Sequence, residues 1–135
     1  MSTTREFRIG NVPVGGRHPL FLIAGPCVIE SDTHCSHMAQ ELKSVCERAG
    51  VPLIFKASHD KANRTSVDSF RGPGMQEGLR VLKSIRESLG LAVLTDVHEV
   101  SQVGPVAEGV VGRLSVSVSG SADEGRDEHL SYPIG

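Results

Sequence analysis

Cationic and hydroxyl-bearing residues are concentrated between Phe55 and Gly74, in the sequence FKASHDKANRTSVDSFRGPG. An arginine fork binds a phosphate ester bidentately, a lysine supplies a point charge, and hydroxyl and main-chain N–H groups complete the shell. We therefore interpret this stretch as an anion-binding loop. The spacing alone leaves open a solvated basic loop without a ligand. The candidate anion-binding residues are Lys56, Ser58, Lys61, Asn63, Arg64, Thr65, Ser66, Ser69 and Arg71.

The loop lies between a predicted strand and a predicted helix. The apolar run Val51–Phe55 precedes it, and Gly72-Pro73-Gly74 gives a tight turn before a helix-like segment. Ligands of α/β proteins bind at the carboxyl ends of parallel strands, so the position favours a binding site. Lys56 and Ser58 are expected to share one side of the strand end, because side chains alternate along a strand.

Composition limits the class of protein. The chain has 135 residues, a net charge of −2 and 39% hydrophobic residues, which fits one soluble domain with a modest core. The positive charge is local and Trp is absent, which argues against a nucleic-acid partner. No run approaches the roughly 18 apolar residues of a membrane span, and the start has no signal-peptide pattern, so a cytoplasmic location is expected. Three cysteines without CxxC spacing indicate reduced thiols.

Strand-like and helix-like segments alternate after a short extended piece, Arg5–Val14. Apolar positions at helical spacing in the first helix are Met38, Leu42, Val45 and Ala49. The order βαβαβα predicts parallel, right-handed units. The expected strands are Leu20–Ala24, Val51–Phe55 and Leu91–Thr95, and the expected helices run from Ser31 or Asp32 to about Arg48, from about Pro73 to Ser88, and from about Val100 to Glu108.

Polar residues follow all three predicted strands. They are Cys27 after the first strand, the loop after the second, and Asp96, His98 and Glu99 after the third. This arrangement is typical of the working face of a (β/α)8 TIM barrel. A flavodoxin-like sheet is the alternative, and the length favours it, because a complete barrel usually needs about 250 residues.

Four motifs resemble the 3-deoxy-D-manno-octulosonate 8-phosphate synthases. The motifs are AGPCVIES at 24–31, FKASHDKANRTS at 55–66, SFRGPG at 69–74 and TDVHE at 95–99. The related 3-deoxy-heptulosonate phosphate synthases share GPC, whereas KANRTS followed by SFRGPG separates the two groups. One position departs from the pattern, since His59 stands where the family usually has an aromatic residue. The resemblance covers about Phe21 to Glu108.

The resemblance implies an enzyme of the transferase class that condenses phosphoenolpyruvate with D-arabinose 5-phosphate and water, in lipopolysaccharide (KDO) biosynthesis. By motif, Lys56, Ser58 and Lys61 would hold phosphoenolpyruvate. Asn63, Arg64 and Thr65 would hold arabinose 5-phosphate, with Asp96 at the sugar hydroxyls. Lys61 and Asp96 are the residues expected to act in catalysis. The resemblance also implies a homotetramer for the parent enzyme.

Cys27 after Gly-Pro resembles the metal-dependent branch of the family. A thiolate suits a divalent ion such as Zn or Fe, with Mn or Co as alternatives. The resemblance implies that a histidine, a glutamate and an aspartate from later strands complete the ligand set. Without the motif around it, Cys27 would equally fit a small buried cysteine in a strand-end turn.

The sequence changes character after Glu108. Residues 109–135 are rich in Ser, Gly and charge, with weak alternation at Val116 and Val118, and are expected to be irregular. The predicted organisation is an extended segment at 1–19, a partial barrel at 20–108, and a tail at 109–135 that we interpret as truncated or frame-shifted. The metal ligand set is then incomplete, which leaves the activity of the 135-residue form open. The alternative functions are a 3-deoxy-heptulosonate phosphate synthase and a non-catalytic phosphate-ester binding module.

Overall fold

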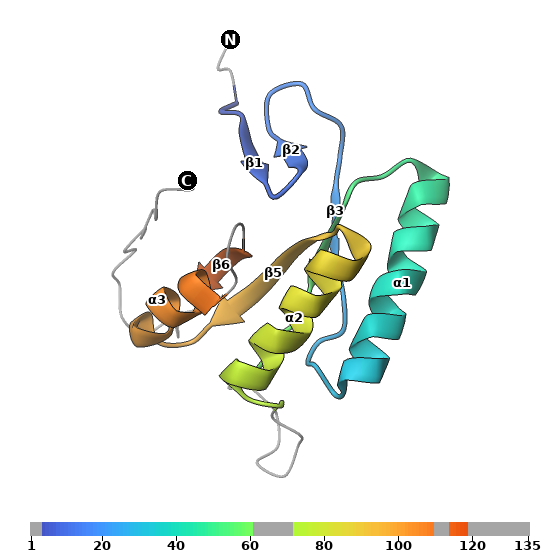
Figure 1. Ribbon diagram of the computed structural model, residues 1–135. Coiled ribbons are helices and arrows are strands. Elements are labelled where there is room, and N and C mark those ends of the chain that lie inside the picture. The colour runs from blue at the N-terminus through green and yellow to red at the C-terminus, as the bar shows by residue number, and fades with distance from the viewer. Residues whose placement is uncertain (1–3, 61–71, 110–113, 119–135) are drawn as a thin grey trace.

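The computed structural model describes residues 4–60, 72–109 and 114–118, which form an α/β fold (Figure 1). After an N-terminal hairpin, strands and helices alternate, so the predicted βαβαβα order is confirmed. The elements are β1 Phe7–Ile9, β2 Val12–Val14, β3 Leu22–Ala24, α1 Asp32–Ala49, β4 Leu53–Lys56, α2 Met75–Leu89, β5 Ala92–Val97, α3 Val100–Gly109 and β6 Leu114–Val118.

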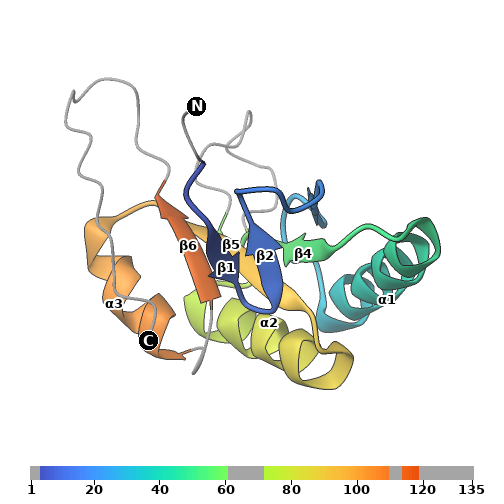
Figure 2. The same ribbon diagram turned by 90° about the horizontal axis from the view of Figure 1, so that it is seen from above.

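One parallel sheet has the strand order β3-β4-β5-β6, so each strand pairs with the next one along the chain. A flavodoxin-like sheet reverses its order at a switch point, whereas a barrel does not. The three helices cover one face of the sheet (Figure 2). The fold is therefore the N-terminal part of a (β/α)8 barrel. Within the described residues the sheet is open, with β3 and β6 at its edges.

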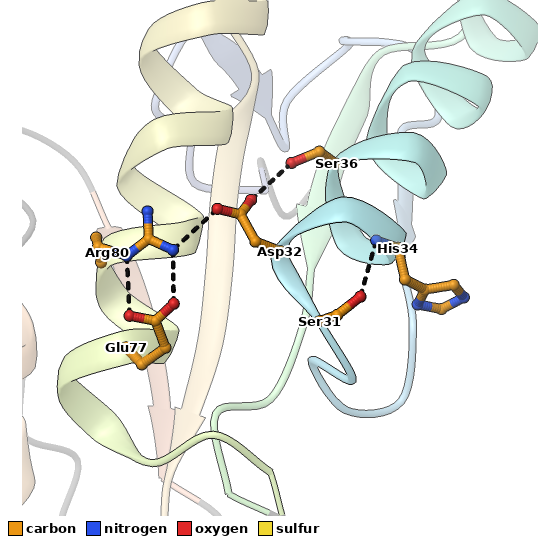
Figure 3. Close-up of polar contacts among 6 residues, drawn as sticks. All are labelled: Ser31, Asp32, His34, Ser36, Glu77 and Arg80. Atoms are coloured by element: carbon orange, nitrogen blue, oxygen red, sulfur yellow. Dashed lines mark hydrogen bonds and ion pairs between the residues drawn. The ribbon is translucent and has the colours of Figure 1, made fainter.

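Helix α1 begins and ends at residues that satisfy its free main-chain groups. The Ser31 side chain accepts a hydrogen bond of 3.1 Å from the main-chain N–H of His34, which is a standard N-cap (Figure 3). Gly50 ends the helix at φ 68°, and its N–H donates to the carbonyls of Cys46 and Glu47. The expected start and stop of this helix are confirmed.

An ionic cluster connects the N-terminal halves of α1 and α2. Arg80 on α2 donates to Asp32 on α1 at 2.9 Å and to Glu77 at 2.9 Å, and Ser36 donates to the second Asp32 oxygen at 3.1 Å (Figure 3). The four side chains are solvent-accessible or only part-buried, so each contact adds little to stability. Together they fix the spacing of the two helices at the end of the sheet where the loops lie.

The main core lies between the sheet and the helices α1 and α2. From α1 it takes Cys35, Ala39 and Cys46, whereas Val45 of the predicted apolar stripe is 49% exposed. A second cluster packs the end of β5 against α2 and α3. The main core contains Ile29, Cys35, Ala39, Cys46, Leu53, Phe55, Ala57, Val81, Leu82, Ile85, Leu91 and Val93. The second cluster contains Leu79, Val97, Val103 and Val106.

The N-terminal hairpin covers the other face of the sheet, which we call the inner face. β1 and β2 pair antiparallel through the Gly10-Asn11 turn, and Pro13 is accommodated opposite Arg8. Val12 and Val14 pack against Ile54 of β4 and Ala92 of β5. The extended piece expected at the start of the chain is therefore a hairpin that buries the inner face near the start of β4 and β5.

The segment 109–135 was expected to be irregular, but Leu114–Val118 form β6, parallel to β5. Residue alternation in this short stretch is weak, and the pairing is favoured because β5 offers unpaired main-chain groups along that edge. Residues 110–113 and 119–135 lie outside the described residues. Among the residues that are described, no helix is long and apolar enough to cross a membrane.

Candidate functional site

Three predicted site residues lie together where β4 and β5 end. Ile54 and Ala92 face the hairpin, so side-chain alternation places Lys56 and Ser58 on the same inner face as Ile54. On β5, the same alternation places Asp96 on the inner face. Lys56 pairs with Leu94, two residues before Asp96, so the cation and the carboxylate come from adjacent strands at the same end of the sheet.

Ser58 is held rigidly by its main chain while its hydroxyl is left without a partner. The residue is fully buried, and its carbonyl accepts a hydrogen bond of 3.0 Å from the N–H of Ile29. It also forms a parallel bridge with Val28, which follows Cys27. Within the described residues its Oγ has no hydrogen-bond partner. A buried hydroxyl of this kind is expected to bind a ligand or water.

Asp96 lies in a similar situation on β5. Its side chain is 15% exposed, and Oδ2 lies 3.6 Å from Nε2 of His98. Its other oxygen, Oδ1, is buried and without a hydrogen-bond partner among the residues described. Two lone pairs near the strand end are therefore available to the hydroxyl groups of a ligand.

His98 joins the ends of β4 and β5. Its Nε2 lies 2.9 Å from the carbonyl oxygen of Asp60, and its main-chain N–H donates to Oε1 of Gln102 at 3.0 Å. With Nε2 as the donor to Asp60, the imidazole is oriented beside Asp96. The sequence placed His98 near the site, because it follows Asp96 by two residues. The contribution of Asp60 had no sequence signal, because it comes from a carbonyl oxygen.

Cys27 lies in the turn that follows β3, and its thiol is exposed. The structural alternative of a small buried cysteine is therefore wrong. In the described part of the chain, no three His, Cys, Asp or Glu side chains come together as a potential metal site. Cys27 is a single soft donor at this position.

Four of the predicted substrate-binding residues lie outside the described residues. These are Lys61, Asn63, Arg64 and Thr65. The described chain ends at Asp60 and resumes at Gly72, and the N–H of Gly74 donates to the carbonyl of His59 at 3.2 Å. The two described ends that flank residues 61–71 are therefore held together next to Ser58.

Comparison with known proteins identifies the family. Residues 3–112 match the model of the DAHP synthetase I family. The chain belongs to this family. This member is 58% identical over 105 residues to the 2-dehydro-3-deoxyphosphooctonate aldolase of Pelobacter propionicus. It is 56% identical over 104 residues to the protein of the same name from Geotalea uraniireducens, and 57% identical over 105 residues to that from Geobacter sulfurreducens.

These alignments cover most of this chain but a minor part of each relative. They include 77–78% of this family member and 38–39% of the three relatives. The chain thus spans about two fifths of the length of the curated relatives that it matches. The matched region contains β3 to α3 and the end of the sheet where Lys56, Ser58 and Asp96 lie.

Proposed function

We propose that this chain provides the N-terminal part of a synthase site for 3-deoxy-D-manno-octulosonate 8-phosphate. The reaction condenses phosphoenolpyruvate with D-arabinose 5-phosphate and water and releases phosphate. The observation that supports it is the group formed by Lys56, Ser58 and Asp96, with a buried hydroxyl and a carboxylate oxygen unpaired among the described residues. This group of residues occurs in a chain that is 58% identical, over 105 residues, to a 2-dehydro-3-deoxyphosphooctonate aldolase.

The reaction explains why cations and hydrogen-bond donors are needed here. Both substrates are anionic, so they repel each other until fixed positive groups hold them in reacting geometry. Lys56 supplies a charge for the phosphate or carboxylate of phosphoenolpyruvate, and the Ser58 hydroxyl donates to it. The Lys61 ammonium, which follows in the loop, completes this half of the site and acts with Asp96 in catalysis.

Asp96 is assigned to the sugar. Its Oδ1 accepts a hydrogen bond from a hydroxyl near the reacting carbon of arabinose 5-phosphate, while Oδ2 faces His98. Asn63, Arg64 and Thr65 hold the sugar phosphate, with Arg64 as the bidentate partner. Two anions are thereby bound on either side of the gap between β4 and β5.

A divalent ion, Zn, Fe, Mn or Co, is part of the proposal for the complete enzyme, with Cys27 as one ligand. A metal at this position would act as a Lewis acid. The described residues supply Cys27 alone and so do not form such a site by themselves. The roles of Lys56, Ser58 and Asp96 do not depend on it. A cytoplasmic location, a role in lipopolysaccharide biosynthesis and a homotetrameric parent belong to the same proposal.

Phosphate release and ligand binding test the proposal. Phosphate should be released from phosphoenolpyruvate only when arabinose 5-phosphate is present, and Lys56→Met should weaken phosphoenolpyruvate binding by about tenfold or more, as expected for loss of a charge-assisted contact. Lys83→Met, at a lysine of α2 whose nearest carboxylate, Glu87, is 4.0 Å away, is the matched control and should change nothing. Equal weakening by both variants would contradict the assigned site.

The substrate series separates the remaining functions. Turnover with erythrose 4-phosphate in place of arabinose 5-phosphate would identify a 3-deoxy-heptulosonate phosphate synthase. Binding of phosphoenolpyruvate without turnover would identify a phosphate-ester binding module, a result compatible with a chain that spans 39% of its relative.

A further inference from the structure

His59 is a buried histidine directly beside the site, on the face opposite Ser58. Its exposed fraction is 1%, and its side chain lies against the first turn of α2. A Cβ atom added to Gly78 of that turn would lie 2.4 Å from the Cβ of His59. His59 is therefore buried, with its Cβ packed closely against helix α2.

The main chain of His59 connects several parts of the site. Its carbonyl accepts the hydrogen bond from Gly74 that closes the base of the anion-binding loop. On one side, the carbonyl of Ser58 is bonded to Ile29, and on the other, the carbonyl of Asp60 lies 2.9 Å from His98. A shift of His59 would thus move both Ser58 and the support of His98.

The surroundings of the ring favour its neutral form. Burial lowers the pKa of His59, His98 acts in the same direction, and Asp60 and Asp96 oppose both. The first turn of α2 adds the partial positive charge of free N–H groups. Neither ring nitrogen makes a well-formed hydrogen bond among the described residues, and the main chain of Asp96 only partly offsets the effect of burial, so an imidazolium here would be desolvated and poorly compensated.

Other charged groups near the ring do not change this balance. Glu77, the acidic residue in the first turn of α2, is exposed and is paired with Arg80. Among the described residues, the titratable groups that act on the ring are thus Asp60, Asp96 and His98.

We propose that His59 is a positioning residue of this site and acts only as the neutral imidazole, so that acidification displaces Ser58 and Asp60 and weakens the binding of phosphate esters. The inference rests on the function proposed above. A protonated ring must reach water or a counter-ion, and the close contact with Gly78 allows this only if the end of β4 moves. The site is therefore pH-sensitive through a residue that does not touch the ligand.

A titration followed by NMR tests the structural part without any ligand. The ordinary pKa of a histidine is 6.5, and His37, which is exposed on α1, is the reference histidine for the measurement. The His59 ring should remain neutral at that pH and protonate only in more acidic solution, with the amide signals of Ser58 and Asp60 moving in the same step. Titration of His59 together with His37, or unmoved amides, would overturn the proposal.

Binding of phosphoenolpyruvate, measured by calorimetry over the same pH range, tests the functional part. His59→Phe keeps an aromatic ring that cannot be protonated, and His37→Phe is the matched control. Below the His59 pKa, the affinity for phosphoenolpyruvate should fall as the pH decreases. The fall should be up to about tenfold per pH unit steeper in the wild type and in the control than in His59→Phe. The protonation of the ligand phosphate is common to all three proteins and cancels in the comparison.

Parallel affinity profiles in all three proteins would overturn the role of His59. If none of them binds phosphoenolpyruvate at any pH, the proposed function fails, and the NMR titration still decides whether His59 positions Ser58 and Asp60. If His59→Phe does not fold, the wild-type titration gives the same decision.

Discussion

The hydroxyl of Thr95 donates a hydrogen bond of 2.8 Å to the carbonyl oxygen of Ala57, and both residues are completely buried. In the same place, the N–H of Ala57 donates to the carbonyl of Leu94 at 3.2 Å. Ala57 lies between Lys56 and Ser58, so these two bonds set where β4 ends relative to β5. The two side chains proposed to bind substrate are thus positioned from the opposite side of the sheet.

Thr95→Val should therefore destabilise the fold and loosen the site together. The change leaves the Ala57 carbonyl buried without its partner, which costs about 1 to 3 kcal/mol in the free energy of unfolding. Urea unfolding measures the loss. The control, Thr33→Val at an exposed position of α1, should stay within about 0.5 kcal/mol of the wild type. Equal stability of Thr95→Val and the wild type would contradict the importance of this bond.

Two glycines in helices should respond in opposite ways to alanine. In Gly78→Ala the new Cβ would meet His59 at 2.4 Å, and overpacking of this kind costs about 1 to 3 kcal/mol. Gly104 of α3 has open space around the corresponding position, so Gly104→Ala should leave stability unchanged or raise it by less than about 1 kcal/mol. Thermal unfolding of both variants checks this, and a stabilised Gly78→Ala would show that His59 is not enclosed.

The contact between Asp32 and Arg80 should give a pH-dependent contribution to stability. Hydrogen bonds from Arg80 and then Ser36 lower the pKa of Asp32 below its ordinary value of 3.8. The folded state therefore binds the proton less readily than the unfolded state. The contribution is complete above about pH 3.8 and is lost as the pH falls through the lower folded value.

Asp32→Asn measures this contribution. The difference in free energy of unfolding between the variant and the wild type should be present near neutral pH and close in acid. It should also shrink at high salt, because the pair is exposed. Glu41→Gln, at an exposed carboxylate of the same helix, is the matched control for the loss of one negative charge. A gap that persists in acid would mean that the amide harms the helix start in another way.

The three thiols should differ strongly in reactivity. Cys27 is exposed, whereas Cys35 and Cys46 are buried. Burial, with a smaller effect of Asp32, raises the pKa of Cys35 to about 11, and the thiolate is the reactive form. A disulfide reagent should modify Cys27 rapidly and the other two only on unfolding. Cys27→Ser should abolish the rapid phase, and its persistence in that variant would contradict the packing of α1.

The order of elements was predictable because its signals are local. Ser31 and Gly50 bound α1 by capping, Gly74 and Gly90 bound α2, and a short apolar run indicates each core strand. Lys56 and Ser58 could be assigned to one face from alternation alone. These features depend on a few neighbouring residues, so the sequence by itself determined the fold class and the end of the sheet where the site lies.

Only the tertiary structure decided which side chains are buried and what they meet. Cys35 and Cys46 of α1 enter the core while Val45 is exposed, because the rotation of the helix is set by its packing on the sheet and α2. The link from His98 to the Asp60 carbonyl depends on the path of two chain segments 38 residues apart. The enclosure of His59 likewise depends on Gly78 being a residue without a side chain at the point of contact.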